Sequence, residues 1–262
     1  MAIIQNTSLA RLRAGKISIG FGAGALRTVA TPMYAKAAGF DWLFIDMEHG
    51  AFSINEATQL CIAALPTGVT PIVRVCFDAL DEATRALDNG AMGIVIPHID
   101  TPEQAKRVAD ALRYPPQGHR SWGGGIAAYG FSPPPAAEAQ AEINAEVMVV
   151  AMIETEAAVA NAEAIAATPG IDVLLIGTSD LSADMGISGQ VGHERVQNAY
   201  RTVIAACRKH GKFAGLGGVY DDVWARTYIQ WGAKFVLGGA DQMFILQAAT
   251  ARARFLASLD PA

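Results

Sequence analysis

Ionisable side chains follow several apolar runs of strand length in this sequence, directly where each run ends. The run 42–45 leads into Asp46, Glu48 and His49. Charged side chains are rarely buried without partners, so ionisable groups at the end of an apolar strand suggest a functional site. Further runs end at the ionisable residues Arg74, His98, Glu154 and Asp180, and Ser179 directly precedes Asp180.

Glu154 and Asp180 follow neighbouring runs, so their carboxylates can approach one point. Two carboxylates held together require a cation or a shared proton. Oxygen ligands favour a hard divalent ion such as Mg²⁺ or Mn²⁺, with water and substrate completing its coordination. The alternative is a pair of solvated loop carboxylates. A zinc site is disfavoured because the five histidines form no HxH or HExxH pattern.

Arg74 and His49 are the next candidates. A guanidinium at the end of a buried strand suits a carboxylate or a developing oxyanion, although a structural ion pair with Asp46 or Asp78 is the alternative. The imidazole of His49 has an intrinsic pKa near neutrality and suits a general base, unless it is structural. Schiff-base chemistry is not expected, because the lysines fall in predicted helices or at strand starts.

A repeating backbone must position these residues. Apolar runs rich in β-branched residues alternate with alanine-rich segments of helical period, and Gly or Pro stands at most junctions. Strands are predicted at 17–22, 41–46, 70–76, 92–97, 147–153, 172–177, 212–217 and 234–239. Helices are predicted at 25–38, 53–65, 79–89, 102–112, 156–168, 193–210, 221–231 and 241–257. Eight such units in about 250 residues match a (β/α)8 TIM barrel, in which the strand ends meet on one face. We expect one barrel domain over residues 1–262.

The composition narrows the class of protein. Hydrophobic residues make up 52% and charged residues 17%, which favours a compact core. A net charge of −5 without a basic run argues against a nucleic-acid partner. Neither a signal peptide nor a membrane span is recognisable, so a cytoplasmic location is expected. Cys61, Cys76 and Cys207 are far apart and are expected to be buried, reduced thiols.

Five blocks of the sequence resemble the HpcH/HpaI aldolase family of metal-dependent pyruvate aldolases. They are GFDWLFIDMEH at 39–49, PIVR at 71–74, YPPQGHR at 114–120, IET at 153–155 and IGTSDLSADMG at 176–186. The blocks stand in the family's order and span nearly the whole chain.

The resemblance implies a fold, an assembly and a set of roles. It implies a (β/α)8 barrel that exchanges its C-terminal helix between subunits of a homohexamer. It further implies a divalent metal, Mg²⁺, Mn²⁺ or Co²⁺, on Glu154 and Asp180, with His49 as general base and Arg74 stabilising an enolate. Asp88 of a neighbouring subunit would raise the basicity of His49, and the backbone N–H of Ser179 would hold the pyruvate carboxylate. Asp46 is expected to orient either Arg74 or a metal-bound water.

Three departures from the family concern the substrate pocket. Met152 replaces a Gln two residues before the metal Glu, the segment 20–22 reads GFG where a relative has Trp, and 121–125 reads SWGGG in place of a second Arg-bearing stretch. Aldehyde specificity therefore cannot be transferred from the family. The residues expected to shape the pocket are Gly22, Trp122, Leu216 and Gly217.

The predicted enzyme is a class II pyruvate aldolase, a carbon–carbon lyase that adds pyruvate or a similar 2-oxo acid, such as hydroxypyruvate, to an aldehyde and gives a 4-hydroxy-2-oxo acid. Two alternatives stay open. One is an acyl-CoA lyase of the citrate lyase β type, which would need a basic surface for the CoA phosphates. The other is a non-catalytic barrel that binds a keto acid.

Overall fold

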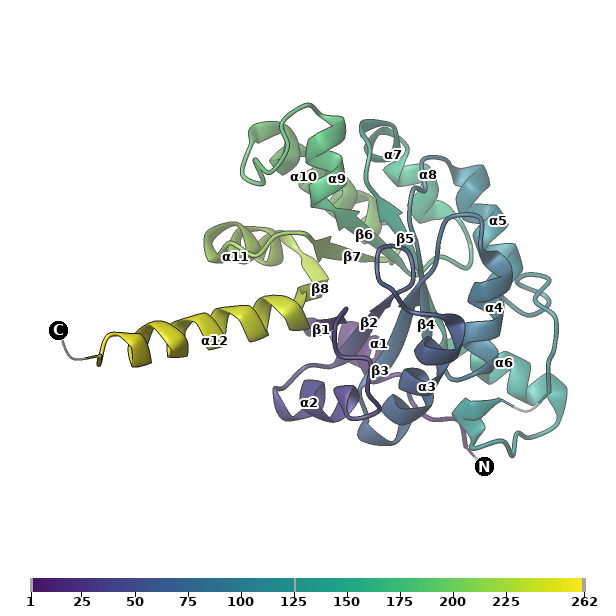
Figure 1. Cartoon of the computed structure of the whole chain (residues 1–262). Helices are drawn as coiled ribbons and strands as arrows, with labels where there is room; N and C mark the ends of the chain where they lie inside the picture. The colour runs from purple at the N-terminus through teal and green to yellow at the C-terminus, as the bar shows by residue number, and fades with distance from the viewer. Residues whose placement is uncertain (1, 125, 261–262) are drawn as a thin grey trace.

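The computed structural model describes residues 2–124 and 126–260, in which eight parallel strands close into a barrel (Figure 1). The strands are β1 Ser18–Ala23, β2 Trp42–Asp46, β3 Thr70–Arg74, β4 Gly93–Ile96, β5 Met148–Ile153, β6 Val173–Gly177, β7 Phe213–Gly217 and β8 Ala233–Ala240. They pair in chain order, and β8 pairs with β1. Every strand begins and ends within two residues of its predicted range. The (β/α)8 prediction is therefore confirmed.

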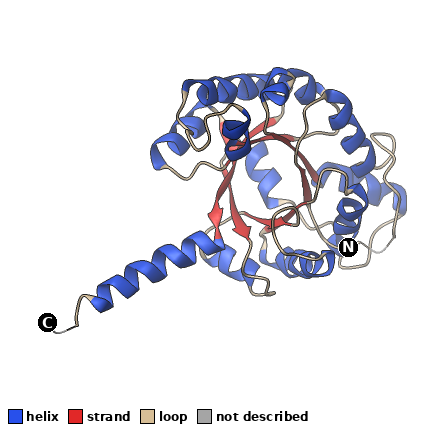
Figure 2. Ribbon diagram, turned by 45° about the horizontal axis from the view of Figure 1, so that its top comes forward, coloured by secondary structure: helices blue, strands red, loops and turns tan. Residues whose placement is uncertain are grey.

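Helices surround the ring of strands (Figure 2). They are α1 Thr7–Arg13, α2 Thr31–Ala37, α3 Ile54–Ala64, α4 Leu80–Asp88, α5 Pro102–Leu112, α6 Ala136–Glu146, α7 Glu156–Ala160, α8 Ala162–Ala167, α9 Thr178–Asp184, α10 Glu194–Lys209, α11 Asp222–Trp231 and α12 Asp241–Ala257, with 3-10 turns at Leu65–Thr67 and Ala127–Tyr129. Side chains define several starts. Ser53 and Glu56 form a capping box before α3, as do Thr101 and Gln104 before α5.

Two predicted helices are wrong in extent. The helix predicted at 25–38 begins only at Thr31, because the backbone N–H groups of Gly24, Ala25 and Leu26 donate to the Asp241 carboxylate and form a loop. The helix predicted at 156–168 is split at Asn161, which leaves the helical conformation while its side chain donates to the carbonyl of Asp100. The site therefore has a structured loop after β1.

The barrel interior and the helix layer form separate cores. Inside the barrel, Trp42 stacks on Phe235 with ring centroids 4.1 Å apart. Residues from the β2, β5 and β6 strands, Phe44, Met152 and Leu175, lie above this pair and reach the carboxyl ends of the strands. We call this end the mouth. Buried apolar residues thus form the floor of the mouth, while ionisable groups stand at its rim.

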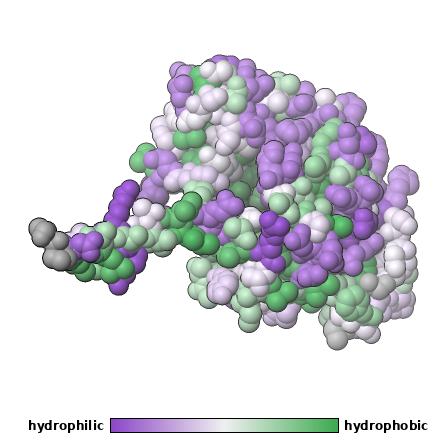
Figure 3. Space-filling model, viewed as in Figure 1, coloured by the Kyte–Doolittle hydropathy of each residue, from purple (hydrophilic) through white to green (hydrophobic). Residues whose placement is uncertain are grey.

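The C-terminal helix α12 projects away from the barrel (Figure 1). Its apolar residues Met243, Ile245, Leu246, Phe255 and Leu256 are between 41% and 66% exposed, and apolar atoms lie at its base in Figure 3. A large exposed apolar surface of this kind is typical of an interaction site. Exchange of this helix between subunits stays a prediction.

Two further expectations concern the cysteines and membranes. Cys61 and Cys207 are buried free thiols, but Cys76 is exposed in the loop that follows β3, so its predicted burial is wrong.

No helix among residues 2–124 and 126–260 is long and apolar enough to cross a membrane.

Candidate active site

Two adjoining cavities open at the mouth. The β6 cavity has a volume of about 300 Å³ and is lined by Met152, Ser179, Asp180 and Gly217, among others. The β1 cavity, of about 450 Å³, is lined by Gly22, Arg27, Asp46 and Ala51, among others. Both cavities are bordered by Phe44, His49, Arg74, Tyr220 and Leu237. A molecule in each cavity would therefore meet the other beside His49 and Arg74.

Arg74 is fixed at the shared border. Its Nε and Nη2 atoms donate to the two oxygens of Asp46, at 2.9 and 2.6 Å. Asp46 and Arg74 are paired in register across β2 and β3, so the sheet itself aligns this bidentate contact. Nη1 lies 3.0 Å from Oε2 of Glu48 in an ion pair without hydrogen-bond alignment. Burial favours loss of the proton, but Asp46 and Glu48 outweigh it and raise the pKa of Arg74, which therefore stays charged.

Asp46 also organises the chain beyond β2. Its Oδ1 atom accepts the backbone N–H groups of Glu48 and His49, at 3.1 and 3.2 Å. Burial raises the pKa of Asp46, while the hydrogen bonds and charge of Arg74 and the two N–H groups lower it, and the net pKa is lowered. Asp46 is thus an anion that orients both the Arg74 guanidinium and the backbone of His49.

The His49 side chain is 68% exposed and borders both cavities. Its Nε2 atom lies 3.9 Å from Oε2 of Glu48, beyond hydrogen-bonding distance. The backbone is held by Asp46, while the imidazole is free to approach a molecule in either cavity. This is suitable placement for a proton carrier.

Glu154 lies at the opposite side of the mouth and is almost fully buried. Its Oε2 atom accepts the backbone N–H of His98 at 2.9 Å. Burial raises its pKa, the His98 N–H and imidazole and Arg74 oppose the rise, and the negative charge of Asp180 adds to it, so the net pKa is raised. A buried carboxylate beside a second carboxylate is stabilised by a bound cation.

His98 connects the two sides. Its Nδ1 atom lies 3.4 Å from Glu154 and its Nε2 atom 3.3 Å from Glu48. The backbone of His98 is left-handed, with φ of 54°, which is uncommon outside glycine. The imidazole of His98 therefore lies between Glu48 and Glu154 and contacts both carboxylates.

Ser179 and Asp180 occupy the first turn of α9, directly after β6, and both line the β6 cavity. The structure thus brings together Glu154, Asp180, Arg74 and His49 around the mouth. No cluster of three or more His, Cys, Asp or Glu side chains able to hold a metal occurs in the described ranges. Glu154 and Asp180 are the two carboxylates here that could hold a hard divalent ion, with water and substrate completing its coordination.

Three predicted residues lie away from the mouth. Leu216 is fully buried in the layer between barrel and helices, so the prediction that it shapes the pocket is wrong. Trp122 packs edge-on against Tyr114, with ring centroids 5.5 Å apart. It is absent from the described residues that line the two cavities, so it does not shape the pocket of this chain as predicted. Asp88 ends α4 and pairs with Arg120 at 2.6 Å. Its expected role in another subunit stays a prediction, and Gly125 of the 121–125 segment lies outside the described residues.

Several residues of the mouth escaped the sequence analysis. Tyr220 stands three residues after β7, where a search of all strand ends would have found it. The sequence does not single out Arg27 and Asp241, because its pattern predicts a helix over 25–38 and places Asp241 in the first turn of another helix. Their signal is weak, since an Arg in a loop and an Asp at a helix start are both common.

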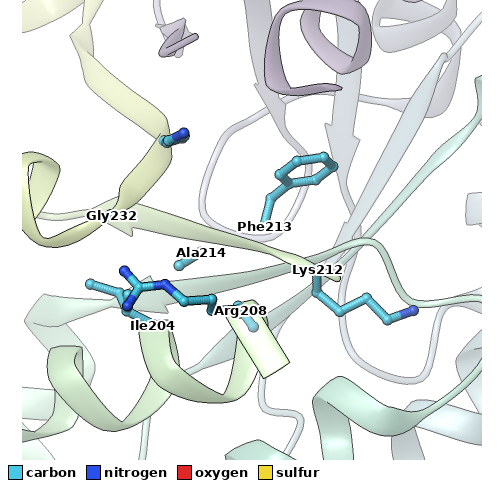
Figure 4. A pocket seen from close by; sticks show the side chains of 8 residues that line it. Ile204, Arg208, Lys212, Phe213, Ala214 and Gly232 are labelled. Atoms are coloured by element: carbon cyan, nitrogen blue, oxygen red, sulfur yellow. The ribbon is translucent and has the colours of Figure 1, made fainter. Parts of the chain in front are cut away.

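A third cavity, of about 230 Å³, lies at the opposite end of the barrel between α10, β7 and β8 (Figure 4). Three cations line it, and each donates to a backbone carbonyl: Lys212 to Ile171 at 2.7 Å, Lys234 to Gly15 at 2.9 Å, and Arg208 to Trp231 at 3.4 Å. These side chains satisfy carbonyls at chain turns, which is a structural role. The two lysines lie at strand starts, as predicted.

Known proteins resemble this chain in sequence and in fold. The model of the HpcH/HpaI aldolase/citrate lyase family matches residues 23–248. The chain is 37% identical to a 4-hydroxy-4-methyl-2-oxoglutarate aldolase of Hapsidospora irregularis, over 99% of this chain and 97% of the relative. It is 34% identical to a 2-keto-3-deoxy-L-rhamnonate aldolase of Escherichia coli, over 92% of this chain and 90% of the relative. The crystal structure of an HpcH/HpaI aldolase from Desulfitobacterium hafniense superposes with a TM-score of 0.90 at 30% identity, covering 100% of this chain and 99% of that one.

Proposed function

The chain belongs to the HpcH/HpaI aldolase/citrate lyase family, and from that premise we propose that it joins a 2-oxo acid to a carbonyl acceptor at the mouth of the barrel. It is a carbon–carbon lyase of the class II aldolase type, which acts on small keto acids and uses a divalent metal ion. The observation that carries the site assignment is the pair of cavities that share His49 and Arg74.

The β6 cavity is the proposed donor site. Pyruvate, or a close analogue such as hydroxypyruvate, would lie there with its carboxylate toward the backbone N–H of Ser179. Glu154 and Asp180 would hold the metal ion, which we propose to be Mg²⁺ or Mn²⁺, with Co²⁺ as a substitute. When bound, the ion supplies Lewis-acid polarisation of the 2-oxo acid.

His49 and Arg74 perform the remaining steps. His49 removes a proton from the methyl carbon of the donor, since its exposed imidazole reaches the border of both cavities. The charge that develops on the keto oxygen is stabilised by Arg74, which Asp46 holds in one orientation. The donor carbon then bonds to the acceptor carbonyl carbon in the β1 cavity, and the acceptor oxygen takes the proton that His49 removed from the donor. Cleavage follows the same path in reverse.

Asp88 is proposed to act between subunits. Its carboxylate would approach His49 of a neighbour in a homohexamer and raise the basicity of the imidazole. Within one chain Asp88 is paired with Arg120 at the end of α4, which holds it in a fixed direction.

Deuterium exchange at the methyl group of pyruvate tests the proposal without an acceptor. We expect exchange by proton NMR in D₂O when Mg²⁺ or Mn²⁺ is present, and loss of exchange after chelation. Glu154→Gln should lose metal affinity and exchange. Glu156→Gln is the matched control, because Glu156 is 53% exposed and pairs with Arg195 on the outer surface. Absence of exchange in the wild-type protein with either metal would contradict the proposed function.

A further inference from the structure

Arg27 lies at the rim of the β1 cavity, on the loop between β1 and α2. Its side chain is 44% exposed. Its Nη1 atom donates to the carbonyl of Ala51 at 3.2 Å, and its guanidinium carbon lies 5.8 Å from the centre of the Phe52 ring. Arg27 therefore extends from the loop after β1 to the loop after β2, beside the opening of the cavity.

Arg27 forms an ion pair with one carboxylate, and the distance between the charged atoms is long. Its carboxylate neighbour is Glu56, whose Oε1 atom lies 3.5 Å from Nη1, while the other oxygen of Glu56, Oε2, accepts the N–H and the hydroxyl of Ser53, each at 2.8 Å. Asp46, at the other end of the same cavity, is engaged by both arms of Arg74. Both of these contacts with protein oxygens, to Ala51 and to Glu56, are made by Nη1, so in the described part of the chain Nε and Nη2 are left to pair with a ligand.

The acidic group nearest the loop is likewise engaged. Asp241 is 1% exposed, and its carboxylate accepts the N–H groups of Gly24 at 3.1 Å, Ala25 at 2.9 Å and Leu26 at 2.6 Å. It also accepts the N–H of Gln242 at 2.7 Å. These hydrogen bonds engage both oxygens of Asp241 and fix the backbone from which Arg27 extends.

We propose that Arg27 binds a carboxylate of the acceptor, so that the enzyme prefers carbonyl acceptors that carry a carboxylate group. The inference rests on the proposed function, which places the donor in the β6 cavity and leaves the β1 cavity for the acceptor. The acceptor carbonyl lies beside His49 and Arg74, where the new carbon–carbon bond forms, and its carboxylate reaches the rim. A guanidinium pairs with a carboxylate through two parallel hydrogen bonds. Arg27 is a specificity-determining residue in this assignment.

Matched acceptors test the proposal. Succinic semialdehyde and butanal differ in that a methyl group replaces the carboxylate, and glyoxylate and acetaldehyde form a shorter pair of the same kind. With pyruvate as donor and Mn²⁺ present, we expect the wild-type enzyme to have a higher kcat/KM for the carboxylate member of at least one pair. Arg27→Gln should lower that preference by about ten- to hundredfold, mainly through KM, because a charge-assisted contact is lost. Arg27→Lys should restore part of it.

Arg201→Gln is the control, since Arg201 lies on α10, stacks on Trp231 and contacts Asn198 on the outer surface. It should keep the wild-type preference. An unchanged preference in Arg27→Gln, or a wild-type enzyme without preference in either pair, would overturn the assignment of Arg27. Deuterium exchange into pyruvate by the wild-type enzyme separates the two hypotheses. Its absence would refute the proposed function, whereas exchange combined with unchanged selectivity in Arg27→Gln would refute the carboxylate subsite alone.

Discussion

The close approach of Gly177 to Glu154 gives a sharp test of the metal site. A Cβ atom added at Gly177 would lie 2.6 Å from Oε1 and 2.7 Å from Cγ of Glu154. The backbone at Gly177, with φ of −85°, accepts any side chain, so Gly177→Ala introduces no backbone strain of its own. The substitution therefore acts on the Glu154 side chain.

The size of the effect follows from the geometry. An ordinary carbon–oxygen contact is at least about 3.4 Å, so the carboxylate must retreat by roughly 1 Å, and a displacement of that size at a reacting centre costs about a hundredfold in rate. Retreat also strains the 2.9 Å hydrogen bond from the His98 N–H. We expect Gly177→Ala to weaken metal binding by about ten- to hundredfold and to lower pyruvate exchange in parallel.

Isothermal titration with Mn²⁺ measures the affinity, and Gly217→Ala provides the comparison. Gly217 pairs with Gly177 in register on the next strand, but a Cβ atom there would lie 3.4 Å from the carbonyl of Ile176 and 3.6 Å from Leu175, which is ordinary contact. Gly217→Ala should keep the wild-type Mn²⁺ affinity. Wild-type affinity in Gly177→Ala would refute the assignment of Glu154 as a ligand, and equal losses in both variants would point to general disturbance of the strand ends.

Further substitutions separate proton transfer, orientation and loop anchoring. His49→Ala should lower pyruvate exchange by about 10²- to 10⁴-fold while Mn²⁺ affinity in titration stays at the wild-type value, and retained exchange would exclude His49 as the base. Asp46 has a folded-state pKa below its ordinary value of 3.8, so its pairing with Arg74 adds stability that is present above that pH and is lost as the pH falls through the folded pKa. The unfolding free energy of Asp46→Asn, measured by urea titration, should therefore fall less steeply than that of the wild type below about pH 4. Asp241→Ala leaves buried N–H groups without an acceptor and should destabilise the fold by about 1–3 kcal/mol in the same assay, whereas Asp260→Ala, near the exposed C-terminus, should not.

The barrel could be predicted because its strands are buried on both faces and read as continuous apolar runs. The same property hides which face each residue takes. Leu216 was assigned to the pocket, but it points to the helix layer, while its neighbours Gly215 and Gly217 lack side chains that would have indicated the alternation. In β6, Leu175 faces the interior and Ile176 the helices, although both are equally apolar. In a strand that is buried on both faces, packing decides which side chains point into the barrel, and the hydrophobicity of the residues does not reveal it.

The grouping of chemical residues at strand ends could also be predicted, since barrel topology brings them to one face. The contacts among them could not. The bidentate Asp46–Arg74 pair depends on the register of β2 against β3, which the sequence leaves open. The loop that carries Arg27 depends on a carboxylate more than two hundred residues away, at Asp241. Long-range contacts of this kind have no local signal.

His98 explains how the two sides of the site keep a common geometry. A left-handed backbone costs a residue with a side chain about 1–2 kcal/mol, and the surrounding structure must over-determine it. At His98 this conformation directs the N–H toward the buried Oε2 of Glu154, while the Nε2 atom of the imidazole lies 3.3 Å from Glu48. Glu48 is in turn the neighbour of Arg74. His98 therefore links the carboxylate proposed to hold the metal with the guanidinium proposed to stabilise the enolate. Its hydrogen bond to Glu154 and its contact with Glu48 offset the free-energy cost of the left-handed backbone.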